Sequence, residues 1–170
     1  SMPTKPIILT AIPVAFGDDG AVSIEANTAI LKKCAESGVD GAFVIGTTGE
    51  FPSLSEDERR VLTRLSLDVL PNKRVVVHVG AHSLYQVERL IQIVREEGAK
   101  EVACITPYFL PSTDEALLAF YRRVSEVSDG LGVFVYLFKD RTGITVSPEL
   151  MAQIAKFPNI IGVKISGESL

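Results

Sequence analysis

Residues 159–166 form an apolar, β-branched run that contains one lysine, Lys164. A central strand of a parallel sheet is buried on both faces and reads as a continuous apolar run. Lysine is rarely buried there without a chemical reason. Desolvation lowers the pKa of an amine and frees its lone pair, so Lys164 is a candidate Schiff-base nucleophile. The alternative is a lysine at the end of the strand whose ammonium group reaches water.

An amine of this kind can attack a ketone and form a protonated imine, which stabilises a carbanion on the adjacent carbon. Carbon–carbon bonds can then be made or broken without a metal. The steps need a proton donor and acceptor, and the phenol of Tyr136 is a candidate relay. The alternative for Tyr136 is a core or interface residue of a strand.

Two further stretches could bind carboxylates. Thr47 and Thr48 lie between two glycines, directly after a predicted strand, where backbone N–H groups and hydroxyls can converge on an anion. Arg141 could hold a second carboxylate with its planar fork of donors. The alternatives are an ordinary strand-to-helix loop and a surface arginine.

The histidines and cysteines show no metal-ligand spacing. His78 lies in a predicted strand and His82 near a predicted helix start, and neither is assigned a role. Cys34 and Cys104 are expected to be reduced core residues of a cytoplasmic protein. No metal and no cofactor is therefore expected.

Short apolar runs, bounded by turn residues, alternate along the whole chain with segments whose apolar residues recur at helical spacing. Capping residues mark the predicted helix starts, and one of them, Ser55, forms a capping box with Glu58. The helix behind Ser55 is expected to carry Val61, Leu62, Leu65 and Val69 on one face. The strands are expected at residues 6–14, 41–45, 74–80, 101–106, 132–138 and 159–166, with helices starting after Ser23, Ser55, Ser83, Thr113 and Ser147.

Strict alternation of strand and helix predicts an α/β protein with parallel βαβ units. An open doubly wound sheet and a (β/α) barrel both fit. No glycine-rich dinucleotide or phosphate loop is present. The unusual residues follow the carboxyl ends of several strands, where barrel enzymes build their sites. We therefore predict one domain over residues 1–170, the first six strands of a (β/α)8 TIM barrel that is truncated after strand six.

Composition excludes several function classes. The chain has 170 residues, 46% hydrophobic and 22% charged, and a net charge of −4. No basic block suggests nucleic acid or an anionic membrane surface, and no apolar run is long enough to span a bilayer. The N-terminus lacks a signal-peptide pattern, so a cytoplasmic protein is expected.

Four motifs occur in a specific order: Gly46-Thr47-Thr48-Gly49-Glu50, Thr106-Pro107-Tyr108, Tyr136 with Arg141-Thr142-Gly143, and Ile161-Gly162-Val163-Lys164. Tyr136 and Lys164 are 28 residues apart. Together these motifs resemble the dihydrodipicolinate synthase / N-acetylneuraminate lyase family, from the first strand to the lysine.

The resemblance implies a (β/α)8 barrel, a homotetramer or dimer, and lyase chemistry of the class I aldolase type on pyruvate or another 2-keto acid. It implies that Lys164 forms the Schiff base and that Tyr136 and Thr47 relay protons. It also implies that Thr47 and Thr48 bind the keto-acid carboxylate, and that Arg141 binds the carboxylate of a second substrate.

The sequence departs from the synthase pattern. Phe109 stands where the synthase branch has a second tyrosine, which reaches into the neighbouring subunit. The residues after Tyr136 and Lys164 also differ from the usual ones. These changes favour a catabolic or divergent member: an aldolase for 2-keto-3-deoxy sugar acids, a sialic-acid-type lyase, or a dehydratase of keto-deoxy sugar acids. A keto-acid-binding homologue without turnover is the alternative.

Overall fold

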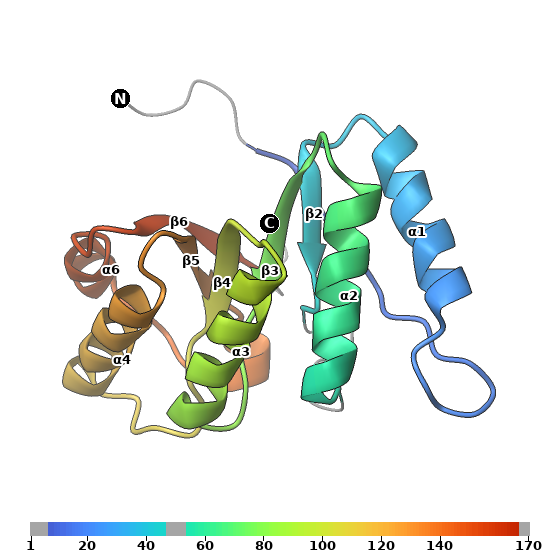
Figure 1. Ribbon diagram of the computed structural model, residues 1–170. Helices are drawn as coiled ribbons and strands as arrows, with labels where there is room; N and C mark the ends of the chain where they lie inside the picture. The colour runs from blue at the N-terminus through green and yellow to red at the C-terminus, as the bar shows by residue number, and fades with distance from the viewer. Residues whose placement is uncertain (1–6, 47–53, 167–170) are drawn as a thin grey trace. The chain divides into compact units, whose positions relative to one another are not determined.

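The computed structural model describes residues 7–46 and 54–166. The chain divides into two compact units, Ser1–Val77 and His78–Leu170, and each is described by itself. In both units parallel strands alternate with helices, which confirms the predicted α/β class (Figure 1).

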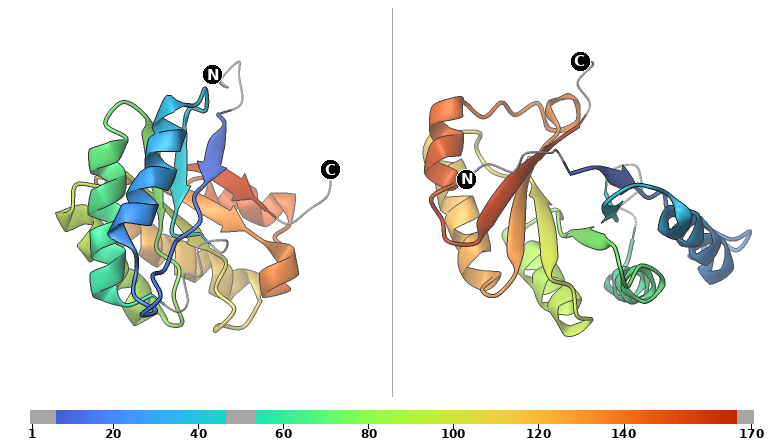
Figure 2. Two further views of the ribbon diagram at one scale, coloured as in Figure 1. Left: turned by 90° about the vertical axis from the view of Figure 1, so that its right-hand side faces the viewer. Right: turned by 90° about the horizontal axis from the view of Figure 1, so that it is seen from above.

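The first unit contains β1 (Leu9–Ala11), α1 (Ile24–Glu36), β2 (Gly41–Val44), α2 (Glu56–Val69) and β3 (Arg74–His78), the last of which ends on the first residue of the second unit. The strands pair in parallel, β1 with β2 and β2 with β3. Helices α1 and α2 lie side by side on one face of these strands (Figures 1 and 2). Strand β1 is shorter than the predicted run of residues 6–14.

The predicted helix starts of this unit are confirmed. The Ser23 hydroxyl accepts a hydrogen bond from the N–H of Ala26 at 3.1 Å. Ser55 and Glu58 form the complete capping box, with reciprocal bonds of 3.1 and 3.0 Å. Of the apolar residues expected on one face of α2, Leu62 is buried, whereas Val61 is 40% exposed. The buried residues of α2 are Arg59, Leu62, Thr63 and Ser66.

The second unit contains α3 (Leu84–Glu96), β4 (Glu101–Ile105), α4 (Asp114–Val127), β5 (Gly132–Leu137), α5 (Lys139–Thr142), α6 (Pro148–Ile154) and β6 (Ile160–Ile165). Strand β5 pairs in parallel with β4 on one side and β6 on the other. Helices α3, α4 and α6 gather on one face of these strands (Figure 2).

Local sequence signals located the helices of this unit correctly, except α5. The side chains of Ser83, Thr113 and Ser147 cap α3, α4 and α6 as predicted. The short α5 was not predicted, because four residues are too few to show a helical apolar period.

Strand β6 does not have two buried faces in the described chain. Its burial alternates, and Ile161, Val163 and Ile165 are 49%, 40% and 62% exposed. Lys164 belongs to the other, half-buried set. The expectation of continuous burial was therefore wrong, although the apolar run does form a strand.

Asn159 fixes the start of β6. Its Nδ2 group donates to the carbonyl oxygens of Ser125, Ser128 and Leu131 at 3.1, 3.0 and 3.2 Å. Its Oδ1 atom accepts from the Ser125 hydroxyl. One side chain thus ties the strand that carries Lys164 to the α4–β5 connection.

We predict that Asn159→Ala lowers the free energy of unfolding by about 2–4 kcal/mol, because it removes the hydrogen bonds of this side chain to three carbonyl groups and to the Ser125 hydroxyl. Urea denaturation measures the loss. Gln153→Ala, at an exposed position of α6, is the matched control and should leave stability unchanged. Equal stability of the two variants would contradict this role of Asn159.

Candidate active site

Tyr136 and Lys164 are direct neighbours in the sheet. They are register partners across β5 and β6. The Lys164 Nζ atom lies 4.7 Å from the centroid of the Tyr136 ring. The tyrosine is buried, with 1% of its surface exposed. The structure therefore brings together the two residues for which the sequence predicted imine formation and proton relay.

The amine of Lys164 is partly desolvated. It lies on the half-buried side of β6 and donates a hydrogen bond to the Ser166 hydroxyl at 2.6 Å. Burial lowers the pKa of Lys164 below the ordinary lysine value. A larger fraction of the amine is then neutral and nucleophilic near neutral pH.

Two aromatic side chains surround the Tyr136 ring. Phe138 lies 6.1 Å away, centroid to centroid, at an interplanar angle of 45°. His78 lies 5.3 Å away at 88°, in an edge-to-face arrangement. The phenol ring is therefore enclosed by side chains from β3, β6 and the residue after β5.

His78 is a residue of this site that the sequence analysis left without a role. It is completely buried, and its Nε2 atom accepts a hydrogen bond from the N–H of Ile105 at 3.3 Å. A Cβ atom on Gly80 would lie 2.5 Å from the His78 ring, so the glycine makes room for it. A histidine inside an apolar β run, two residues before a glycine, was the available signal.

Arg141 lies on α5 and is exposed. The helix is anchored through Thr142, whose hydroxyl donates to the Phe138 carbonyl at 3.2 Å and lies 3.4 Å from the Thr106 hydroxyl. Burial raises the pKa of Tyr108, and the positive charge of Arg141 opposes that shift.

The Tyr108 phenol is also hydrogen bonded to His82 Nδ1. The structure therefore pairs Tyr108 with His82, and the charge of Arg141 acts on the Tyr108 phenol. Thr47 and Thr48 lie outside the described residues, and their predicted role in carboxylate binding stays a prediction.

Phe109, the departure noted in the sequence, packs within its own chain. Its ring lies 6.1 Å from Phe120 of α4 and 5.9 Å from Tyr108, centroid to centroid. This position contributes apolar packing and no hydroxyl to the site.

The described residues offer neither a metal cluster nor a membrane span. Across residues 7–46 and 54–166, histidine, cysteine and carboxylate side chains nowhere gather in threes around a common point. No helix in this part of the chain combines the length and the apolar character needed to cross a bilayer.

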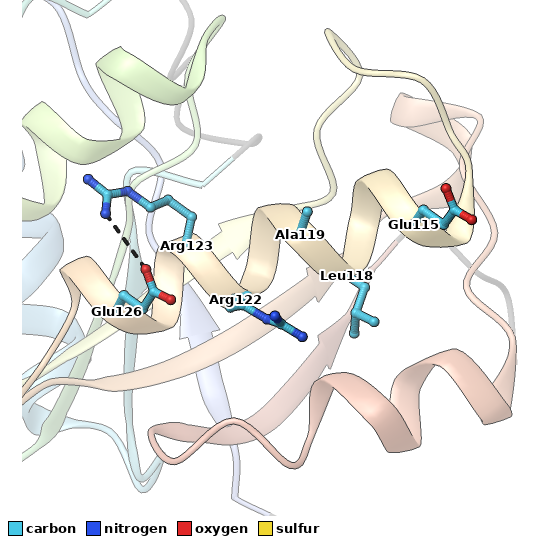
Figure 3. Close-up of a pocket in the computed structure, with 6 residues that line it drawn as sticks. All are labelled: Glu115, Leu118, Ala119, Arg122, Arg123 and Glu126. Carbon is cyan, nitrogen blue, oxygen red and sulfur yellow. Dashed lines mark ion pairs between the residues drawn. The ribbon is translucent and has the colours of Figure 1, made fainter.

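A hollow of about 350 Å³ lies on α4 (Figure 3). Its lining comes from this single helix: Glu115, Leu118, Ala119, Arg122, Arg123 and Glu126. An exposed ion pair of 3.7 Å joins Arg123 and Glu126. No residue predicted to bind or react lines it.

The family profile described as "Dihydrodipicolinate synthetase family" matches residues 5–170. The chain belongs to this family. It is 36% identical over 157 residues to 4-hydroxy-tetrahydrodipicolinate synthase of Thermotoga maritima, covering 91% of this chain and 53% of the relative. The enzyme of that name from Mycobacterium leprae is 31% identical over 158 residues, covering 92% and 52%.

Solved structures of dihydrodipicolinate synthase family members have the same fold. A monomeric dihydrodipicolinate synthase variant superposes with a TM-score of 0.85 at 35% identity, covering 93% of this chain and 53% of that one. YagE of Escherichia coli K12, solved in complex with pyruvate, superposes with a TM-score of 0.90 at 27% identity, covering 98% and 56%. These likenesses confirm the predicted partial (β/α)8 barrel.

The chain spans about half the length of the curated family members that it matches. The expectation that residues 1–170 form a single domain stays a prediction.

We predict that Lys164 titrates below the ordinary lysine pKa of 10.5, because its amine is partly buried. Acylation of the full chain at a series of pH values, followed by peptide mass spectrometry, measures this midpoint. Ser166→Ala should lower the midpoint further, since the hydroxyl accepts a hydrogen bond from the charged amine. Ser112→Ala, at an exposed position, is the control and should not move it. A Lys164 midpoint at or above 10.5 would contradict the desolvation argument.

Proposed function

We propose that this protein is a lyase of the class I aldolase type, in which Lys164 forms a Schiff base with pyruvate or a related 2-keto acid. The observation that carries the proposal is the contact of a partly desolvated amine with a buried phenol, 4.7 Å from Nζ to ring centroid. Simple binding of a keto acid does not need a desolvated amine, whereas imine formation does. The family relatives, named as 4-hydroxy-tetrahydrodipicolinate synthases, support the same chemistry.

The neutral Nζ atom of Lys164 adds to the C2 carbonyl carbon and gives a carbinolamine. One proton is taken up, the former carbonyl oxygen leaves as water, and a protonated imine remains. Loss of a C3 proton then gives an enamine whose C3 carbon attacks an aldehyde. Cleavage of a carbon–carbon bond follows the same steps in reverse. Tyr136 carries protons to and from the carbinolamine oxygen, since its phenol is held beside the amine.

The substrate is an anionic keto acid, so the groups that bind it are hydrogen-bond donors and a positive charge. Thr47 and Thr48 bind the keto-acid carboxylate through hydroxyl and backbone donors. Arg141 binds the carboxylate of a second substrate through its guanidinium group. YagE, a structural neighbour solved with pyruvate, supports pyruvate as the first compound to try.

Phe109 favours a divergent branch of the family over the biosynthetic synthase. Its side chain packs on Phe120 and offers no hydroxyl to a relay. We therefore propose that the protein is an aldolase or a dehydratase that acts on keto-deoxy sugar acids. We also propose that the protein is a homo-oligomer, either a dimer or a tetramer, and that it is located in the cytoplasm.

The imine mechanism predicts that pyruvate and borohydride add one reduced adduct to the full chain, located at Lys164. Intact-protein and peptide mass spectrometry detect it. Lys164→Ala should remain folded and gain no adduct. Lys156→Ala, which removes an exposed lysine, is the matched control and should be modified like the parent. An adduct that persists in Lys164→Ala would overturn the mechanism.

The proton-relay role predicts that Tyr136→Phe slows the exchange of pyruvate methyl protons with deuterated water by roughly 100-fold or more, the range for a lost general acid–base. NMR follows this exchange without a second substrate. Tyr121→Phe is the control: its hydroxyl bonds the Cys104 carbonyl, and its loss should leave exchange unchanged. Equal rates in Tyr136→Phe and the parent would remove Tyr136 from the relay.

A further inference from the structure

His78 is a buried polar residue that neither the motifs nor the proposed chemistry uses. It ends β3, is 0% exposed, and lies 5.3 Å from the Tyr136 ring at 88°. Burial of an imidazole is costly unless its polar atoms are satisfied. The question is what this side chain does beside the phenol.

Its hydrogen bond fixes the ring. Nε2 accepts from the N–H of Ile105, so Nδ1 carries the proton of the neutral imidazole. A proton on Nε2 would face the N–H of Ile105, and two N–H donors cannot form a hydrogen bond with each other. The bond from Ile105 therefore selects the tautomer of the neutral imidazole.

The surrounding backbone leaves the ring little freedom. A Cβ atom on Gly80 would lie 2.5 Å from both Cε1 and Nε2 of His78, so the imidazole lies directly against the Gly80 backbone. Ile105, which holds Nε2, is the register partner of Tyr136 in β5. The imidazole is thus fixed to the strand next to the phenol that it contacts.

We propose that His78 is a positioning residue for Tyr136. The imidazole, which is fixed in place, contacts the phenol ring edge to face and holds it in the orientation in which Lys164 lies over it. The proposal rests on the proposed function for its effect on rate. The aromatic contact does the positioning, and the hydrogen bond to Ile105 holds the imidazole in place. Loss of the contact lets the phenol turn, and a small misplacement of a reacting group is costly in rate.

The test uses exchange of pyruvate methyl protons with deuterated water, catalysed by the full chain. His78→Ala should lower the saturated exchange rate roughly 10- to 100-fold. The pyruvate concentration at half-maximal rate should stay unchanged, because His78 acts on the relay and not on carboxylate binding. In a Tyr136→Phe background, His78→Ala should cause no further loss.

Two variants separate the contact from the hydrogen bond. His78→Phe keeps an aromatic ring and should exchange faster than His78→Ala. Its Tm should be lower than that of the parent, because the Ile105 N–H loses its acceptor. His78→Gln can keep an acceptor near the Nε2 position but lacks the ring, so it should be as slow as His78→Ala. Equal losses from His78→Ala with and without Tyr136 would overturn the proposal, as would a full rate in His78→Gln.

A measurement without pyruvate keeps the two proposals apart. NMR of the chain labelled at tyrosine Cζ, with the Tyr136 signal assigned from Tyr136→Phe, reports the phenol directly. His78→Ala should shift or broaden that signal, and His78→Phe should restore it in part. An unchanged signal would overturn the positioning role even if pyruvate is processed. A parent protein that neither exchanges nor traps pyruvate would overturn the proposed function and leave this readout to decide the role of His78.

Discussion

The lateral pairing of β5 with β6 is the constraint on which the candidate site depends. Parallel pairing sets Tyr136 opposite Lys164, and because side chains alternate between faces, a slip of one residue would send the lysine to the opposite side. Gly162 contributes to this pairing, since a Cβ atom there would lie 2.7 Å from the Phe134 ring of the neighbouring strand. Asn159 anchors the beginning of β6 to three carbonyl groups. The register is thus defined by contacts outside the chemistry itself.

Desolvation of the amine is unfavourable for the charged lysine, and the structure offsets it only in part. The Ser166 hydroxyl accepts one hydrogen bond, and the Tyr136 ring offers its electron-rich face to the ammonium. Neither partner carries a negative charge. A carboxylate in the same place would raise the pKa and hold the amine protonated. The Ser166 hydroxyl and the Tyr136 ring thus orient the amine without the stabilisation of its charged form that a carboxylate would add.

Features fixed by neighbouring residues were predictable, and features fixed across the sheet were not. The caps at Ser23 and Ser55 need only the next few residues, and both formed as expected. The pairing of Tyr136 with Lys164 followed from family resemblance. Val61 is exposed, and the buried residues of α2 include Thr63 and Ser66, which hydropathy alone assigns to solvent. His78 was passed over because its partners are 27 and 58 residues away in the sequence.

The strands contribute to the site in different ways. Strands β5 and β6 supply the phenol and the amine, whereas β3 supplies an imidazole and β4 a backbone N–H group. Strands β3 and β4 are linked here by a hydrogen bond that the backbone N–H of Ile105 donates to the His78 side chain. Exchange of His78 removes both this bond and the ring that the phenol contacts. Substitutions on β3 can therefore tune the orientation of Tyr136 without touching the residues that react, which is why the identity of residue 78 belongs to the chemistry as well as to the fold.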